Sequence, residues 1–135
     1  GLARMPQKWV GIALVVMLLA LPVTAALRSY PRWKAGGISA DLLAHEQALR
    51  AATPADARII YCNDLSPHIA LFHLHRNGWS MDESAFNAEK FNLWLGKGAR
   101  YLYSDSRNLE AHPVVQPHLG KLIGEWGRLW IWELR

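Results

Sequence analysis

The sequence predicts an α/β fold: a small three-layer domain with a short parallel sheet of about three strands covered by helices, preceded by one transmembrane helix. Two observations predict it. Residues 9–27 form one uninterrupted apolar run, and short strand-like segments alternate with helix-like segments after it. Parallel strands need such helical crossovers between them. A chain of 135 residues has room for one ordinary domain, which excludes a two-domain enzyme.

The apolar run contains no charged residue, and 16 of its 19 residues are hydrophobic. A helix of that length rises about 28 Å, close to the roughly 30 Å hydrocarbon core of a bilayer. Basic and aromatic residues flank the run at Lys8, Trp9 and residues 28–34, as is typical of lipid headgroup anchors. The alternative is a signal peptide with a cleavage site of small residues at 23–25. Both interpretations place the rest of the chain outside the cytoplasm.

The domain organisation follows from this run. Residues 1–8 are expected to be a truncated flank, because the chain does not start with Met. Residues 28–38 are expected to be a linker and residues 39–135 an extracytoplasmic α/β domain. Residues 28–135 hold 13 basic and 11 acidic side chains in scattered positions, so nucleic acid is not an expected partner. The expected partners are the lipid bilayer and upstream transmembrane helices of the same protein.

The elements of the domain are predicted in chain order. Ser39 is a candidate N-cap for a helix over residues 41–52, which Thr53 and Pro54 end. β-branched and aromatic residues predict strands, whereas proline N-termini, apolar periodicity and terminal glycines predict helices. On these signals we expect strands at 58–62, 99–104 and 129–133 and helices at 66–76, 82–95 and, more weakly, 113–126.

Polar residues follow the first two predicted strands. Ligands of open parallel sheets usually bind outside the carboxyl ends of the strands. This makes candidate ligand-binding residues of Asn63, Asp64, Ser104, Asp105 and Arg107. The competing interpretation is that these residues only end strands and cap helices.

Other chemistry finds little support. The first strand is not followed by a glycine-rich loop, so no nucleotide cofactor is expected. His73 points away from His68 and His75 on a helix of about 100° per residue, so no metal site is expected either. Cys62 could be a nucleophile beside these histidines, but a buried strand cysteine is the favoured interpretation. We therefore predict no catalytic residue, cofactor or metal.

Three short motifs resemble the C-terminal periplasmic domain of bacterial membrane glycosyltransferases, the family of dolichyl-phosphate-mannose protein mannosyltransferases and aminoarabinose transferases. They are Asp64-Leu65-Ser66-Pro67, Arg76-Asn77-Gly78-Trp79 and Gly98-Ala99-Arg100-Tyr101-Leu102. The resemblance implies a parent enzyme in the inner membrane that transfers sugar from a polyprenyl-phosphate donor. It also implies that the catalytic carboxylates lie upstream, so this chain would be a non-catalytic periplasmic domain that supports acceptor binding or active-site closure.

In that interpretation the motif residues Ser66, Pro67, Arg76, Gly78 and Trp79 are structural. Gly78 is expected to cap a helix, Trp79 to anchor back onto that helix, and Arg76 to bind its last carbonyls. A glycan or lipid-linked sugar would be the partner. The alternative is an independent, membrane-anchored or secreted binding module with its ligand at the carboxyl edge of the sheet.

Overall fold

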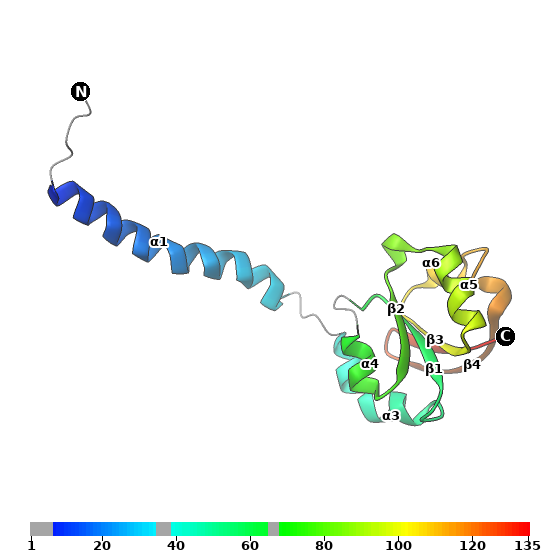
Figure 1. The fold of residues 1–135 in the computed structure, drawn as a ribbon. Helices are drawn as coiled ribbons and strands as arrows, with labels where there is room; N and C mark the ends of the chain where they lie inside the picture. Colours follow the sequence, from blue (N-terminus) through cyan, green and yellow to red (C-terminus); the bar gives the residue numbers. More distant parts are fainter. Residues whose placement is uncertain (1–6, 35–38, 65–67) are drawn as a thin grey trace. The chain divides into compact units, whose positions relative to one another are not determined.

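The chain divides into two units, Gly1–Gly36 and Gly37–Arg135. The computed structural model describes residues 7–34, 39–64 and 68–135 (Figure 1). Within these residues the first unit contains one long helix, and the second contains a sheet with short helices.

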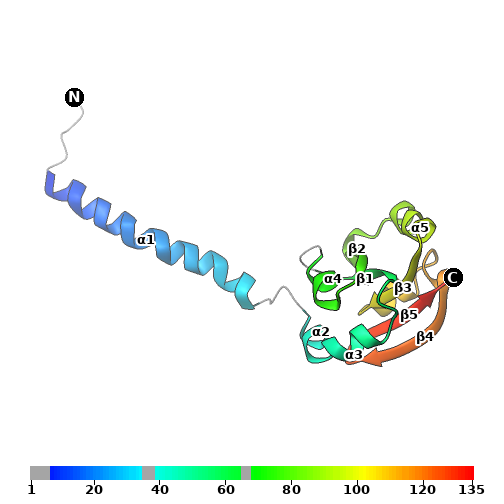
Figure 2. The ribbon, with the colours of Figure 1, turned by 60° about the horizontal axis from the view of Figure 1, so that its bottom comes forward.

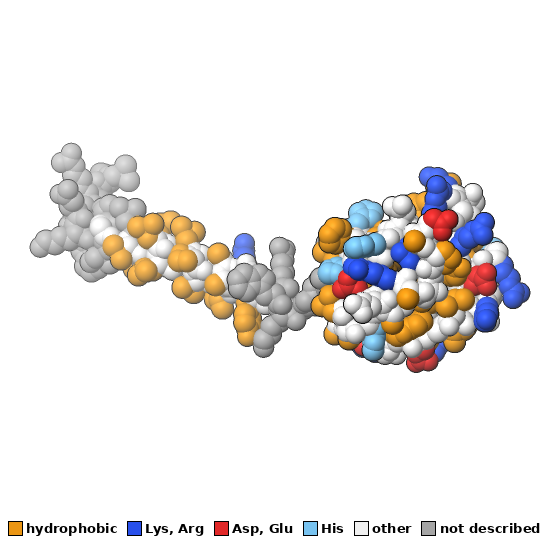
Figure 3. Space-filling model, turned by 90° about the horizontal axis from the view of Figure 1, so that it is seen from below, with side chains coloured by type: hydrophobic (Ala, Val, Ile, Leu, Met, Phe, Trp, Pro, Cys, Tyr) orange, Lys and Arg blue, Asp and Glu red, His pale blue; other side chains and the backbone are white. Residues whose placement is uncertain are grey.

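The helix of the first unit, α1, spans Gln7–Lys34. Its described side chains are largely hydrophobic and exposed, as Leu18 and Leu27 are (Figure 3). Among the residues described, however, no helix combines the length and the apolar character that crossing a membrane requires. The prediction of a transmembrane helix at residues 9–27 is therefore wrong. The apolar run does not set the bounds of the helix, because the helix continues through the basic and polar residues up to 34.

β1, Arg58–Cys62, is an interior strand of the sheet in the second unit and lies where the sequence predicted a strand. Its β-branched and aromatic residues suit an extended backbone. Ile59 and Tyr61 lie in one hydrophobic cluster, and Ile60 and Cys62 lie in a second. Because successive side chains of a strand point to opposite faces, the sheet has a core on each face. The three-layer arrangement follows.

The sheet has five strands in the order β2-β1-β3-β5-β4, and it is mixed rather than parallel. β2 (Asn77–Met81) and β3 (Ala99–Ser104) flank β1 in parallel, whereas β5 (Leu129–Leu134) is antiparallel to β3 and to β4 (Leu119–Trp126). The α/β class is confirmed. The prediction of a parallel sheet of about three strands is wrong, because it omitted β2 and β4.

β4 occupies residues that were predicted as a weak helix. It forms a hairpin with β5 through the two residues between Trp126 and Leu129. Gly127 supplies the left-handed backbone of this turn, with φ +61°, which glycine adopts at little cost. The backbone N–H of Arg128 then donates to the Asp41 carboxylate at 3.3 Å, which ties the hairpin to the first helix of this unit.

Short helices cover both faces of the sheet (Figure 2). On one face Leu42, Leu49 and Leu74 from three helices pack against Tyr103 of β3. On the other face Phe91 and Leu109 pack against Leu102. These helices are α2 (Ala40–Ala44), α3 (Glu46–Ala51) and α4 (Ile69–Leu74) on the first face, and α5 (Ala88–Gly96) and α6 (Arg107–Glu110) on the second. Two 3-10 turns, η1 (Glu83–Ala85) and η2 (Gln116–His118), complete the unit.

The predicted helices are shorter than expected. The helix expected over residues 41–52 breaks at His45 into α2 and α3, and the one expected over 82–95 becomes η1 followed by α5. Asn87 explains the second break, because its side chain caps α5 by accepting from the backbone N–H of Lys90 at 2.9 Å. This cap competes with a continuous helix over 82–95.

Candidate functional site

The carboxyl ends of β1 and β3 bring together side chains far apart in the sequence. Asn63 has φ +59° and donates from Nδ2 to the Asp105 carboxylate at 2.7 Å. Its amide oxygen accepts from the backbone N–H of Glu83 at 2.9 Å. Asparagine tolerates this left-handed backbone better than most residues. Asn63 therefore joins the ends of β1 and β3 to the turn η1.

Asp64 has a different neighbourhood from Asp105. Its Oδ2 accepts from the backbone N–H of Ala70 at 3.0 Å and from the Ser80 hydroxyl at 3.4 Å. The carboxylate thus joins the first turn of α4 to β2. Ser66 and Pro67, which were expected to begin this helix, lie outside the described residues.

The residues after β3 form a compact turn. Ser104 Oγ donates to the Ser106 carbonyl at 3.0 Å and accepts from the Ser106 N–H at 3.1 Å. Ser106 in turn caps α6 by accepting from the Leu109 N–H at 3.2 Å. Both serines are buried, so their hydroxyls serve the fold rather than a ligand.

Arg107 begins α6 and is more exposed than these serines. Its Nη1 donates to Glu110 Oε2 at 2.8 Å, and its guanidinium lies 3.7 Å from the centre of the Trp130 ring. This stacking is a cation–π contact. The structure therefore places Arg107 over β5, where it packs on the sheet.

The pKa values of the acidic side chains at this edge are shifted in opposite directions. Partial desolvation raises the pKa of Asp105, and the hydrogen bond from Asn63 offsets part of that rise. A hydrogen bond with Ser106 lowers the pKa of Glu83, and hydrogen bonds from Ser84 lower that of Asp82. Carboxylates and an amide grouped in this way can accept hydrogen bonds from sugar hydroxyls. In the part of the chain that the structure describes, no three His, Cys, Asp or Glu side chains group so as to hold a metal ion.

Arg76 of the second motif ties two helix ends together. Its Nη2 donates to the carbonyls of Arg50 at 2.5 Å and Thr53 at 2.7 Å, at the end of α3. Its Nη1 donates to the carbonyls of Leu74 and His75 at 3.3 and 3.2 Å, at the end of α4. The planar fork of arginine suits several acceptors at once. Arg76 therefore satisfies carbonyls that two short helices leave unpaired.

Gly78 and Trp79 have places that differ from those expected. Gly78 lies in β2 instead of capping the preceding helix, which ends at Leu74. A Cβ at Gly78 would overlap the carbonyl oxygen of Ile59 in the neighbouring β1. Trp79 stacks on Trp94 of α5, with ring centres 6.0 Å apart and planes 12° apart, instead of packing back onto α4. Both residues position β2 against its neighbours.

Sequence reasoning missed the partners of Arg76. Thr53 Oγ1 accepts from Arg76 Nε at 3.3 Å and lies 2.9 Å from the Tyr103 hydroxyl, which donates to the Leu49 carbonyl at 2.9 Å. These residues lie up to 54 positions apart. Neither a motif nor a periodicity connects them, and the sequence signals only that Thr53 follows a helix.

Cys62 is fully buried in the second hydrophobic cluster. Burial raises the pKa of its thiol, and nearby Asp105 and Glu83 raise it further. Because only the thiolate is strongly nucleophilic, the thiol is poorly reactive in the folded chain.

We expect Cys62 to react with iodoacetamide only after the second unit unfolds. The measurement is the mass of the chain after treatment at neutral pH with and without guanidinium chloride. The expected result is one adduct in denaturant and none without it. A native chain labelled as fast as the denatured one would contradict the burial of this thiol.

No protein family model, curated protein or solved structure matches this chain. The resemblance to membrane glycosyltransferases remains a prediction from three motifs.

Proposed function

We propose that residues 37–135 form a non-catalytic accessory domain of a membrane-embedded glycosyltransferase that takes its sugar from a polyprenyl-phosphate donor. The domain supports acceptor binding or closure of an active site elsewhere in the protein. In this proposal it acts on the periplasmic or extracellular side of the inner membrane, and its partner is a glycan or lipid-linked sugar.

The observation that carries the proposal is the position of the three motifs around β1. Asp64, the described residue of the first motif, lies two residues after the end of β1. The second motif runs into β2 on one side of β1, and the third motif runs into β3 on the other side. Within them Asp64 joins β2 to α4, and Arg76 joins the ends of α3 and α4. Gly78 lets β1 and β2 approach closely. Residues with such roles preserve a scaffold, which is what an accessory domain needs from its signature residues.

The carboxyl edge supports binding rather than chemistry. Asp64 and Ser104 already hold backbone groups in place, and Arg107 is paired with Glu110. Asp105 is exposed, although Asn63 holds one of its oxygens. An exposed carboxylate next to an amide suits weak recognition of a sugar hydroxyl, whereas a catalytic acid needs a reacting group within reach.

The proposal is tested with the complete reading frame that contains this chain. Membranes from cells expressing it should transfer labelled sugar from a polyprenyl-phosphate donor above the level of vector-only membranes. Deleting residues 37–135 should raise the acceptor KM about tenfold or more if the domain binds the acceptor, or lower kcat if it closes the active site, and should leave the donor KM unchanged. The control is a Lys121→Gln variant, whose side chain is exposed on β4.

Absence of transfer with every polyprenyl-phosphate sugar tried would contradict the proposal. So would a deletion that changes neither KM nor kcat, since an accessory domain must affect one of them. In those cases saturable quenching of the Trp fluorescence of the 135-residue chain by free sugars would favour the independent binding module.

A further inference from the structure

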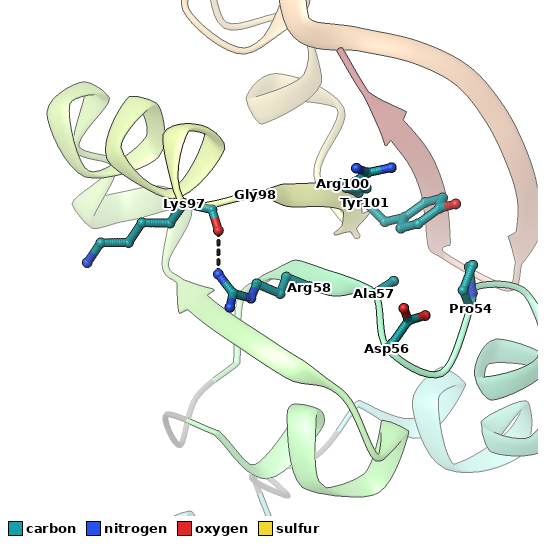
Figure 4. Close-up of a pocket in the computed structure, with 8 residues that line it drawn as sticks. All are labelled: Pro54, Asp56, Ala57, Arg58, Lys97, Gly98, Arg100 and Tyr101. Carbon is teal, nitrogen blue, oxygen red and sulfur yellow. Dashed lines mark hydrogen bonds between the residues drawn. The ribbon is translucent and has the colours of Figure 1, made fainter.

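A concave region lies at the edge of the sheet opposite the candidate site, where β1 and β3 begin. It has a volume of about 440 Å³. Its walls come from the loop before β1, the first residue of β1, the end of α5 and the start of β3 (Figure 4). The lining residues that matter here are Asp56, Arg58, Lys97, Arg100 and Tyr101.

The charge of this pocket is unbalanced. Three cationic residues, Arg58, Lys97 and Arg100, line it together with a single acidic residue, Asp56. The net formal charge of the lining is therefore +2. The Lys97 ammonium lies at the rim and extends away from Arg100 (Figure 4). Among described residues, Lys97 and Arg100 make no side-chain hydrogen bond or ion pair. Their charges are available to a ligand.

Arg58 is held in position by the fold. Its Nη1 donates to the carbonyl of Lys97 at 2.5 Å, the contact drawn as a dashed line in Figure 4. That bond uses one of the five N–H groups of the guanidinium. The guanidinium is planar, and two of its remaining N–H groups can donate to two oxygens of one anion.

Arg100 enters the pocket because of an irregularity in the sheet. In the β1–β3 ladder Arg58 pairs with Ala99, but the next residue, Ile59, pairs with Tyr101. Arg100 is therefore the extra residue of a bulge. Bulges redirect a side chain and are often found beside functional sites. Here the bulge brings Arg100 to the same sheet edge as Arg58 and Lys97.

We propose that this pocket binds the oxygens of a phosphate or diphosphate group through Arg58, Arg100 and Lys97. The phosphate chemistry is shared by a free phosphoryl ligand and by an anionic lipid headgroup. The inference does not depend on the proposed glycosyltransferase role, because it is argued from the charge and shape of the pocket alone, although Arg100 also belongs to the third motif. Exposure of the cations limits affinity, since water and salt screen them.

Titration of the full 135-residue chain with inorganic phosphate and pyrophosphate tests the site. Amide signals of Gly98, Arg100 and Tyr101 in two-dimensional NMR spectra should shift saturably at low salt, and pyrophosphate should bind more tightly because it offers more oxygens. A Lys97→Gln/Arg100→Gln variant should bind roughly fivefold or more weakly. The matched control is Lys121→Gln/Arg135→Gln, which removes the same two kinds of charge elsewhere and should bind within about twofold of wild type.

Vesicles distinguish the two sources of phosphate. Cosedimentation with phosphatidylglycerol vesicles beyond that with phosphatidylcholine vesicles, lost in the Lys97/Arg100 variant and kept in the control, would identify a headgroup as the ligand. Shifts with pyrophosphate and no such vesicle preference would identify a free phosphoryl group. The proposal is overturned if pyrophosphate at about 10 mM shifts none of these amides and the vesicles show no preference. Equal weakening by both double variants would also overturn it, since only overall charge would then matter.

Discussion

Replacing Gly78 by alanine is expected to lower the free energy of unfolding of the second unit by about 3 kcal/mol. The added Cβ would overlap the Ile59 carbonyl oxygen and would lie 2.8 Å from the Ile59 backbone nitrogen. These atoms belong to an interior strand that is paired on both sides, and Ile59 is opposite Gly78 in the β1–β2 ladder. Relief requires β2 to move away from β1. Forced backbone shifts of this kind cost about 1–3 kcal/mol or more.

The matched control is Gly96→Ala in α5. A Cβ at Gly96 would meet no atom within 4 Å, and alanine favours a helix. Its effect should lie within about 0.5 kcal/mol of zero or be slightly stabilising. Urea unfolding followed by circular dichroism measures both variants. A Gly78→Ala variant as stable as Gly96→Ala would show that β2 does not pack against β1 as described.

Replacing Arg76 by lysine should cost about 2 kcal/mol although the charge is kept. Lysine can place one ammonium near one acceptor, whereas Arg76 reaches carbonyls at the ends of both α3 and α4. Hydrogen bonds to charged groups contribute about 1.5–3 kcal/mol, and part of the loss is recovered by water because Arg76 is only half-buried. Thermal or urea unfolding measures the change.

Arg100→Lys is the control for this substitution, because Arg100 is exposed and lacks a side-chain partner among the residues described. Its stability should stay within about 0.5 kcal/mol of wild type. If Arg76→Lys were equally neutral, the contacts of Arg76 would not stabilise the junction of α3 and α4. The structural role assigned to Arg76 in the second motif would then be wrong.

The predictable strands were those whose signal is local. β1 and β3 were predicted at their observed bounds because β-branched and aromatic residues follow one another there. β4 could not be read in this way, since Gly120 and Gly124 weaken the strand pattern. The turn at Gly127 was the available signal, because two residues beginning with glycine between apolar segments favour a hairpin.

β2 illustrates a different limit. Asn77 and Gly78 are typical residues for ending a helix, so the sequence favoured a turn there. The structure extends them beside β1, because Gly78 lets the two backbones approach closely. Such pairing depends on a partner 19 residues away, Ile59 opposite Gly78, which local pattern does not reveal.

The candidate sites show the same division. Asn63 and Asp105 were predicted to lie at the same edge because parallel strands end there, and in the structure a hydrogen bond joins them. The basic pocket was not predicted, because it depends on the bulge at Arg100, and a bulge has no signature in this sequence. Contacts that depend on the register between strands cannot be predicted from local sequence patterns.

In the proposed function this domain supports a glycosyltransferase and supplies none of its catalytic groups. The most direct test is steady-state kinetics of sugar transfer by the complete reading frame carrying Asp64→Asn, Asp105→Asn and Arg107→Gln together. We expect kcat within about twofold of wild type and any change confined to the acceptor KM, because these side chains contact the acceptor or hold the fold. A fall in kcat of about a hundredfold or more, with the protein folded and present at normal amounts, would make them catalytic and contradict the account.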